Sequence, residues 1–313
     1  MTTQRIAVID LGTNTFHLLI VEASADGNID ILFSEKKASR IGKGGISQSI
    51  ITEDAIVRAI ENIRYFRQII NQYEPAKIYA MATSAFRNAS NGTHVAQLIY
   101  EETGITIEII SGEREAEYIY YGVKLAVPLS MEPSLIVDIG GGSVEYIIGN
   151  NEKIFWKKSI EMGGQRLLDM FQKNDPITPE EIENLIQYFN ITLLELDLAI
   201  HQYKPTTFIG SSGSFDTLSE MDIKHKGILY DLDKEKNYTL SSQSFNYFYQ
   251  LLIRKNRAER MLIPGMIELR VDMIVVSSVL IHYILSKYNF PHIVTSTYAM
   301  KEGVIAQLIS GKM

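Results

Sequence analysis

Two stretches of the chain repeat one pattern of apolar and polar positions. The first is Ile6-Ala-Val-Ile-Asp-Leu-Gly-Thr-Asn-Thr-Phe-His-Leu-Leu-Ile20, and its counterpart, 128 positions further on, is Leu135-Ile-Val-Asp-Ile-Gly-Gly-Gly-Ser-Val-Glu-Tyr-Ile-Ile148. Each has an apolar run of strand length, an Asp-x-Gly, a short polar or glycine-rich turn and a second β-rich apolar run. We therefore predict two equivalent strand–turn–strand hairpins, one in each half of the chain.

The segments after the first hairpin alternate between helical and strand patterns. Thr52 is placed to cap a helix whose apolar positions lie on one face, namely Ile56, Ala59, Ile60, Ile63, Phe66, Ile69 and Ile70. Strands are predicted at 77–82 and 105–110, and helices at 95–102 and 113–125. This alternation predicts an α/β fold, with helices layered on a sheet.

The second half repeats this organisation with a longer helical end. Thr178-Pro-Glu-Glu181 is a capping box with proline at the first helical position. A strand at 207–209 runs into the turn Gly210-Ser-Ser-Gly-Ser214, and 241–313 is predicted to be helical except for a strand near 292–296. Val127-Pro-Leu-Ser-Met-Glu-Pro133 breaks both periods, so we expect domains at 1–126 and 127–313.

Composition narrows the class of protein. A chain of 313 residues with 46% hydrophobic and 21% charged residues suits two globular domains. It has no cysteine, so a metal would be held by oxygen or imidazole ligands. The apolar run 271–285 is too short to span a membrane, and the N-terminus shows no signal peptide, so we expect a cytoplasmic protein. A net charge of -7 argues against duplex nucleic-acid binding.

The two turns are candidate phosphate loops. Backbone N–H groups in a glycine-rich turn after a strand can cradle an anion. One such turn alone is often only structural, but two at the same point of a duplicated unit favour phosphate binding. The candidate residues are Gly12, Thr13, Asn14 and Thr15 in the first turn, and Gly140, Gly141, Gly142 and Ser143 in the second.

Carboxylates lie beside both turns. Asp10 and Asp138 end their strands, and Glu145 lies on the second strand of its hairpin. Alone, such an aspartate could simply cap a turn. The symmetric pair favours a site for Mg²⁺ or Mn²⁺, which prefer a few carboxylates together with substrate phosphate oxygens. His17, at the position matching Glu145, is more often structural in such a setting, and we assign it no role.

Six ordered motifs make the chain resemble the exopolyphosphatase and guanosine pentaphosphate phosphatase (Ppx/GppA) family. Besides the two loop segments, these are Ser39-Arg-Ile-Gly-Lys-Gly44, Ala82-Thr-Ser-Ala-Phe-Arg-Asn-Ala89, Ser111-Gly-Glu-Arg-Glu-Ala116 and Met162-Gly-Gly-Gln-Arg-Leu167. The resemblance covers nearly the whole chain. It implies two actin-like (ribonuclease H-like) ATPase domains with a cleft between the lobes.

The resemblance also implies roles for individual residues. Glu115 corresponds to the general base that activates water, and Asp138 and Glu145 correspond to the metal and catalytic carboxylates. Arg87 would bind a phosphoryl group and offset charge in the transition state, and Arg40 would contact phosphate. Without the resemblance, Glu115 could be an acid that stabilises a helix start, and the arginines could be solvated surface charges.

The implied reaction is metal-dependent removal of terminal orthophosphate from polyphosphate. Alternatives are hydrolysis of the guanosine pentaphosphate 5′ γ-phosphate, an actin-like kinase, or a sensor that binds polyphosphate or guanosine tetraphosphate without hydrolysis. Arg114 and Val144 depart from the family pattern, where an acidic residue and threonine are usual. For the assembly, a homodimer is the default expectation.

Overall fold

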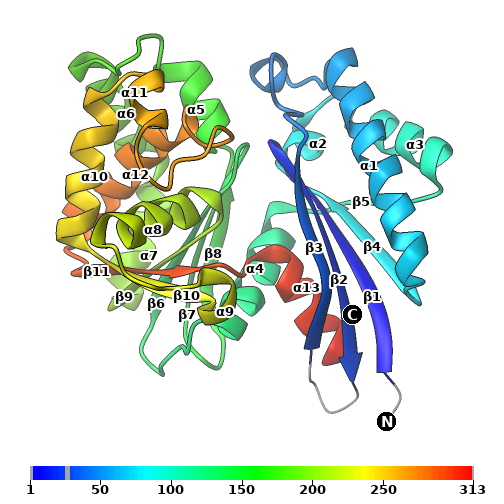
Figure 1. Ribbon diagram of the computed structural model, residues 1–313. Helices are drawn as coiled ribbons and strands as arrows, with labels where there is room; N and C mark the ends of the chain where they lie inside the picture. Colours follow the sequence, from blue (N-terminus) through cyan, green and yellow to red (C-terminus); the bar gives the residue numbers. More distant parts are fainter. Residues whose placement is uncertain (1–2, 25–28, 312–313) are drawn as a thin grey trace. The chain divides into compact units, whose positions relative to one another are not determined.

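The structure is a computed structural model that describes residues 3–24 and 29–311 (Figure 1). It divides into two compact units, Met1–Gly122 with Met300–Met313, and Val123–Ala299. The expected second domain, 127–313, differs from this division because the last helix packs within the first unit. The outer limits of the expected domains, residues 1 and 313, lie outside the described residues.

The first unit is built on a five-stranded mixed sheet in the order β3-β2-β1-β4-β5. β1 pairs antiparallel with β2 and parallel with β4, and β2 also pairs antiparallel with β3. The strands are β1 Thr3–Leu11, β2 Thr15–Ser24, β3 Ile29–Ala38, β4 Lys77–Ala82 and β5 Ile107–Ile109. The predicted hairpin and the strand at 77–82 are confirmed, whereas β3 was not predicted.

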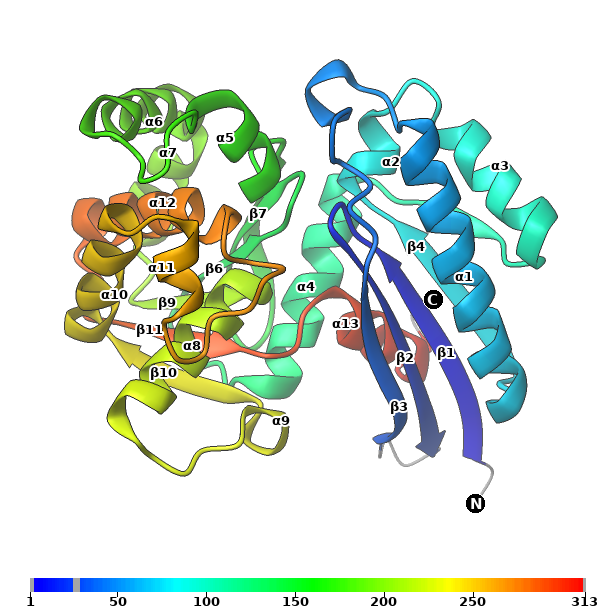
Figure 2. The ribbon, with the colours of Figure 1, turned by 45° about the horizontal axis from the view of Figure 1, so that its top comes forward.

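Helices cover this sheet on both faces, with α1 and α3 on one face and α13 on the other (Figures 1 and 2). α1 forms where predicted and buries Ala59, Ile63, Phe66 and Ile70. Thr52 is its N-cap residue, but the expected cap does not form, because the Thr52 side chain makes no capping hydrogen bond. Gly303 of α13 lies so close to α4 that a Cβ there would come 1.7 Å from the carbonyl oxygen of Tyr118. The elements are the 3₁₀ turn η1 Ile46–Gln48, α1 Glu53–Tyr73, α2 Ser84–Asn88, α3 Gly92–Thr103, α4 Gly112–Ala126 and α13 Met300–Ile309.

The second unit carries a six-stranded mixed sheet in the order β10-β11-β9-β6-β7-β8. Reversed, this order repeats the first sheet, with β8, β7, β6 and β9 in the places of β3, β2, β1 and β4. The strands are β6 Ser134–Ile139, β7 Val144–Gly149, β8 Ile154–Ile160, β9 Thr207–Ser211, β10 Asn237–Ser241 and β11 His292–Ser296. The predicted strands at 207–209 and 292–296 are confirmed, whereas β10 was not predicted.

Helices supply most of the second core. α12 is buried along most of its length, as its nearly continuous apolar sequence requires. The predicted capping box forms, with Thr178 Oγ1 accepting from the Glu181 amide. The helices are α5 Gly164–Phe171, α6 Pro179–Thr192, α7 Leu194–Tyr203, α8 Gly213–Lys226, α9 Leu232–Glu235, α10 Ser242–Arg254, α11 Arg257–Met261 and α12 Met273–Tyr288.

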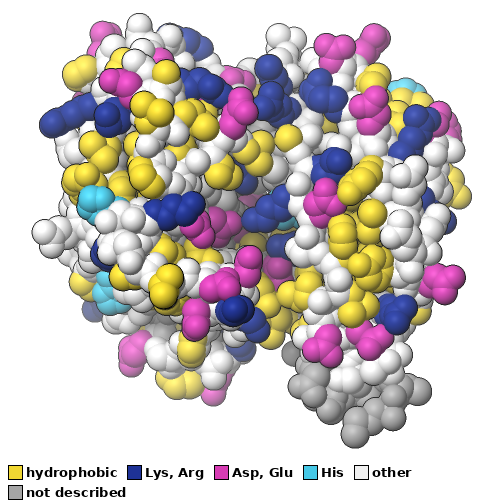
Figure 3. Space-filling view, in the orientation of Figure 1, with side chains coloured by type: hydrophobic (Ala, Val, Ile, Leu, Met, Phe, Trp, Pro, Cys, Tyr) yellow, Lys and Arg dark blue, Asp and Glu magenta, His cyan; other side chains and the backbone are white. Residues whose placement is uncertain are grey.

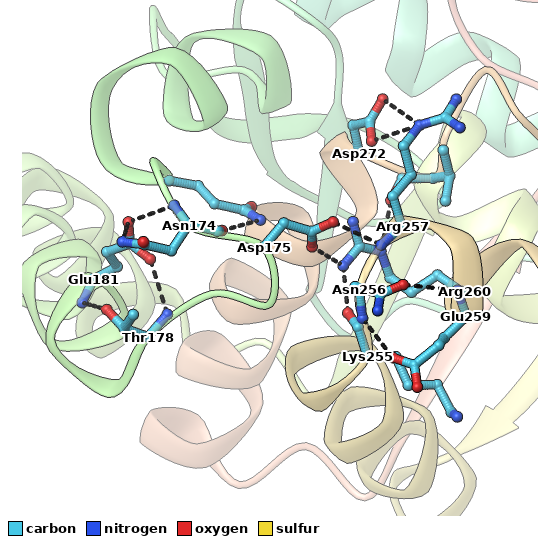
Figure 4. Close-up of polar contacts among 12 residues, drawn as sticks. Asn174, Asp175, Thr178, Glu181, Lys255, Asn256, Arg257, Glu259, Arg260 and Asp272 are labelled. Carbon is cyan, nitrogen blue, oxygen red and sulfur yellow. Dashed lines mark hydrogen bonds and ion pairs between the residues drawn. The ribbon is translucent and has the colours of Figure 1, made fainter.

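A buried arginine joins three segments of the second unit (Figure 4). Arg260 on α11 is 1% exposed and donates from Nη1 to Asp175 Oδ1 at 2.6 Å and to the Lys255 carbonyl at 2.5 Å. Its Nε donates to the carbonyl of Val271 at 3.0 Å. The loop before α6, the start of α11 and the start of α12 are thus held by one guanidinium.

The surface carries charges of both signs. Figure 3 shows acidic, basic and hydrophobic side chains interspersed over the visible face of each unit. Within the described residues, none of the helices combines the length and apolarity needed to cross a bilayer. Because the net charge is -7 and charges of both signs are mixed on the surface, a polyanion would be recognised by a local group of residues.

Candidate active site

The duplicated hairpins fold with the same register. Asp10 pairs with His17 across β1 and β2, and Asp138 pairs with Glu145 across β6 and β7. The turns also match, because Gly12 N–H donates to the Thr15 carbonyl and Gly140 N–H donates to the Ser143 carbonyl, both at 3.1 Å. The repeat seen in the sequence is therefore a repeat of backbone structure, with His17 at the place of Glu145.

Asp138, beside the second loop, is buried. Its side chain accepts hydrogen bonds from Ser211 Oγ at 2.6 Å and from Ser212 Oγ at 2.8 Å. Burial raises the pKa of Asp138, and the two serine hydroxyls and the nearby Arg270 oppose that rise. A carboxylate oxygen has more than one lone pair, so these bonds leave acceptor capacity for a cation.

Ser211 and Ser212 were not singled out from the sequence. Ser211 ends β9 and Ser212 follows it; β9 lies parallel beside β6, with Asp138 opposite Ser211. Because neighbouring parallel strands end at one edge of a sheet, the turn after 207–209 was the signal that could have placed them beside Asp138. Ser212 holds a left-handed φ of 74°, a conformation that non-glycine residues adopt at a cost and that clusters at functional sites.

Arg270 is a second residue that sequence reasoning missed. It lies in the loop before α12. Burial lowers the pKa of Arg270, and the negative charges of Asp216 and Asp138 partly oppose this effect. A Cβ on Gly213 would come 2.2 Å from its guanidinium. Glycine at the start of α8 is thus required for this arginine to lie against the turn at Ser211 and Ser212.

Glu145 is the second residue of the buried strand β7 and is 1% exposed. Residues directly opposite in an antiparallel pair face the same side of the sheet, so Glu145 and Asp138 share one face. Ser159 of β8 donates to Glu145 Oε1 at 2.7 Å. The structure therefore brings these two predicted carboxylates together.

In the first unit, the predicted base and the predicted phosphate-binding arginine are in direct contact. Arg87 Nη1 donates to Glu115 Oε2 at 3.0 Å and to the Ile110 carbonyl at 3.1 Å. α2 follows β4, and α4 follows β5, so both residues come from the sheet edge at which β1 ends in the first loop. Thr13, Asn14 and Thr15 of that loop are buried.

Arg40 and Arg114 lie outside the Arg87–Glu115 contact. Arg40 has a left-handed φ of 47°, its amide donates to the Asn14 carbonyl and its side chain is exposed. The Arg114 side chain is held by other residues: its Nε donates to Tyr118 Oη at 2.7 Å and its Nη1 donates to Glu108 Oε1 at 2.6 Å. The departure at Arg114 is therefore accounted for by local contacts on α4 and β5.

A metal ion would have few protein ligands within one unit. Among residues 3–24 and 29–311, no group of three or more His, Asp or Glu side chains is arranged to hold an ion. Mg²⁺ commonly binds through one or two carboxylates, with waters and substrate phosphates completing its shell. Asp138 and Glu145 on one face of β6 and β7 fit that mode, as does Asp10 at the matching place in the first unit.

The chain matches the Ppx/GppA phosphatase family model over residues 20–311. A crystal structure of an exopolyphosphatase from Cytophaga hutchinsonii is 45% identical, with 99% of each chain covered and a TM-score of 0.96. A Ppx/GppA family member from Aquifex aeolicus has 23% identity, 99% coverage of each chain and a TM-score of 0.82, which shows a shared fold.

A relative from Fusobacterium nucleatum is a bifunctional 3-dehydroquinate synthase/phosphatase. It is 29% identical over 98% of this chain, but the chain spans only 47% of that protein. The similarity therefore covers about half of the bifunctional relative.

Proposed function

Because the chain belongs to the Ppx/GppA phosphatase family, we propose that it hydrolyses the terminal phosphoanhydride bond of inorganic polyphosphate and releases orthophosphate. The observation that carries this proposal is the contact between Arg87 and Glu115 at the sheet edge of the first phosphate loop. A carboxylate, a guanidinium and a backbone anion loop are three of the parts that recur in hydrolytic phosphoryl transfer. The 45% identity to the Cytophaga hutchinsonii exopolyphosphatase supports polyphosphate as the substrate.

Glu115 is assigned the role of general base. It would accept a proton from water as the water oxygen bonds to the terminal phosphorus and the bridging oxygen leaves with the shortened chain. Arg87 would hold oxygens of the transferred group and offset their growing charge. Its contact with the Ile110 carbonyl fixes the guanidinium for this task.

In each unit, the backbone N–H groups of the phosphate loop would bind phosphate oxygens. The residues are Gly12, Thr13, Asn14 and Thr15 in the first loop, and Gly141, Gly142 and Ser143 in the second. In the second unit, Asp138 and Glu145 would hold Mg²⁺ or Mn²⁺, and Asp10 is the candidate ligand at the matching place in the first unit. When bound, the ion would supply positive charge against phosphate oxygens. Ser211 and Ser212 orient the Asp138 carboxylate, and Arg270 balances its charge.

The test is orthophosphate release from long-chain polyphosphate, guanosine pentaphosphate and ATP, each with and without Mg²⁺. The proposal expects metal-dependent release from polyphosphate, with the Glu115→Gln variant purified in parallel to exclude contaminating phosphatases. Faster release from the pentaphosphate would assign the nucleotide as substrate. Orthophosphate release from ATP only would contradict the proposal and favour a kinase. Binding of all three compounds without orthophosphate release would also contradict it and favour a sensor.

A further inference from the structure

The carbonyl groups of the second phosphate loop, Gly140–Gly142, are all turned onto one helix start. The segment Gly163–Arg166, where α5 begins, donates three successive backbone N–H groups to them. These bonds run from Gly164 N to Gly140 O at 2.9 Å, from Gln165 N to Gly141 O at 2.9 Å and from Gly163 N to Gly142 O at 3.0 Å. The helix start is thus a backing for the loop.

This backing fixes the direction of the loop amides. In a trans peptide the C=O of one residue and the N–H of the next point in opposite directions. Because the Gly140 and Gly141 carbonyls accept hydrogen bonds from the start of α5, the N–H groups of Gly141 and Gly142 point away from α5. Within the described part of the chain, neither N–H donates to a backbone carbonyl, which leaves both for an anion.

The first loop has a backing of the same kind from an unrelated sequence. Ser39 N and Arg40 N donate to the Asn14 carbonyl at 2.9 and 3.1 Å, and Gly42 N donates to the Thr13 carbonyl at 3.1 Å. The two segments that donate these bonds occupy equivalent places: residues 39–42 follow β3, and residues 163–165 follow β8. The recurrence in two copies indicates that holding the carbonyls is a requirement of the loops and not an accident of one helix.

The second backing adds a side chain. Arg166 Nε donates to the Gly142 carbonyl at 2.9 Å, its Nη2 lies 3.4 Å from Glu161 Oε2, and its side chain is 13% exposed. α5 also lies as close to the loop as backbone allows, because a Cβ on Gly163 would come 2.5 Å from Gly142 N. Arg166 therefore bonds to the last carbonyl of a loop that has no side chain to stiffen it before Ser143.

We propose that Arg166 is a positioning residue that fixes the second phosphate loop with its N–H groups toward the bound polyanion, and thereby sets affinity for the substrate. This rests on the proposed phosphohydrolase function. The guanidinium does not need to touch substrate to act, since it acts through the Gly142 carbonyl. Its loss would weaken binding of ground state and transition state alike, which is read as a rise in KM with little change in kcat.

The experiment compares Arg166→Met and Arg166→Lys with the unchanged protein. For Arg166→Met we expect KM for polyphosphate to rise about tenfold with kcat within about threefold, because one charge-assisted hydrogen bond is lost. Arg166→Lys, which keeps a cationic donor for the carbonyl, should recover most of the affinity. Arg254→Gln, an exposed arginine of α10, is the matched control and should leave KM unchanged.

Equilibrium binding of sodium tripolyphosphate, measured by calorimetry without metal, separates this inference from the proposed function. If the unchanged protein releases no orthophosphate, the proposed function fails, and weaker tripolyphosphate binding by Arg166→Met would still support the positioning role. A KM within twofold of the unchanged protein, or equal losses in the Lys and Met variants with a fall in Tm, would overturn it. If Arg166→Met does not fold, Arg166→Gln takes its place in the same comparison.

Discussion

Arg87 and Glu115 form a 3.0 Å ion pair between α2 and α4, two helices that begin after neighbouring strands of the first sheet. Both side chains are largely buried, with 18% and 11% of their surfaces exposed. A pair so enclosed has a defined geometry, unlike most exposed ion pairs. The contact thus couples the position of the proposed base to that of the proposed phosphate ligand.

Replacement of Glu115 by glutamine should remove the base while keeping a similar shape. We expect kcat on polyphosphate to fall by about 10²–10⁴-fold, the usual contribution of general base catalysis, with KM little changed. Glu113→Gln, which changes an exposed glutamate two residues earlier on the same helix, is the control. Near-normal turnover in Glu115→Gln would remove Glu115 from the mechanism.

Replacement of Arg87 by methionine should lower both affinity and rate. The guanidinium contacts both Glu115 and the Ile110 carbonyl, and a lysine cannot reproduce its planar fork. We expect kcat/KM to fall by about 10²-fold or more in Arg87→Met, with only partial recovery in Arg87→Lys. Steady-state kinetics measure this, and Arg64→Met, which removes an exposed arginine of α1 paired with Glu102, should have no effect.

Arg40→Gly separates the side chain of Arg40 from its backbone role. At a φ of 47°, glycine relieves a left-handed conformation that costs other residues about 1 kcal/mol, and this offsets its own larger entropy loss on folding. We therefore expect an unchanged Tm. If the side chain binds phosphate as proposed, KM for polyphosphate rises, whereas an unchanged KM would limit Arg40 to the backing of the first loop.

His282 should contribute to acid sensitivity of the fold. It stacks on Tyr249 with ring centroids 4.2 Å apart, and burial lowers its pKa. A histidine with a folded pKa below its ordinary value of about 6.5 stabilises the fold above that pH, and this stability is lost as the pH falls toward the folded pKa.

Replacement of His282 by phenylalanine keeps the ring and removes the titration. We expect the Tm of His282→Phe to fall less than that of the unchanged protein between about pH 7.5 and 5.5. This pH interval spans the ordinary histidine pKa. Thermal scans at each pH measure it, with His94→Gln as the control for an exposed histidine on α3. Parallel pH curves for His282→Phe and the unchanged protein would show that His282 is not responsible.

Arg260→Met should destabilise the second unit strongly. The change leaves the carbonyls of Lys255 and Val271 without their donor and Asp175 without its cation (Figure 4). Arg260 is 1% exposed and Asp175 is 38% exposed, so the main cost is that of two carbonyls left without a donor, about 1–3 kcal/mol each. Arg257→Met, on the same helix with exposed partners, should cost under about 1 kcal/mol. Urea unfolding measures both, and similar costs for the two variants would contradict the assignment.

The sequence by itself determined the local elements and the repeat. Apolar spacing predicted α1, the capping box predicted the start of α6, and the matched Asp-x-Gly runs predicted two hairpins that fold with equivalent register. These elements could be predicted from the sequence because each depends on residues close together in the chain. The ordered motifs also identified the family, since they mark positions along nearly the whole chain.

Only the tertiary structure decided which distant residues meet. Ser211 bonds to Asp138 across 73 positions because β9 lies parallel to β6, and α13 joins the first unit because it packs on β1 and α4. The backing of each phosphate loop likewise comes from a segment over 20 residues away. Local patterns set strands and turns, but strand order and helix docking depend on burial summed over the whole unit, which no single segment encodes.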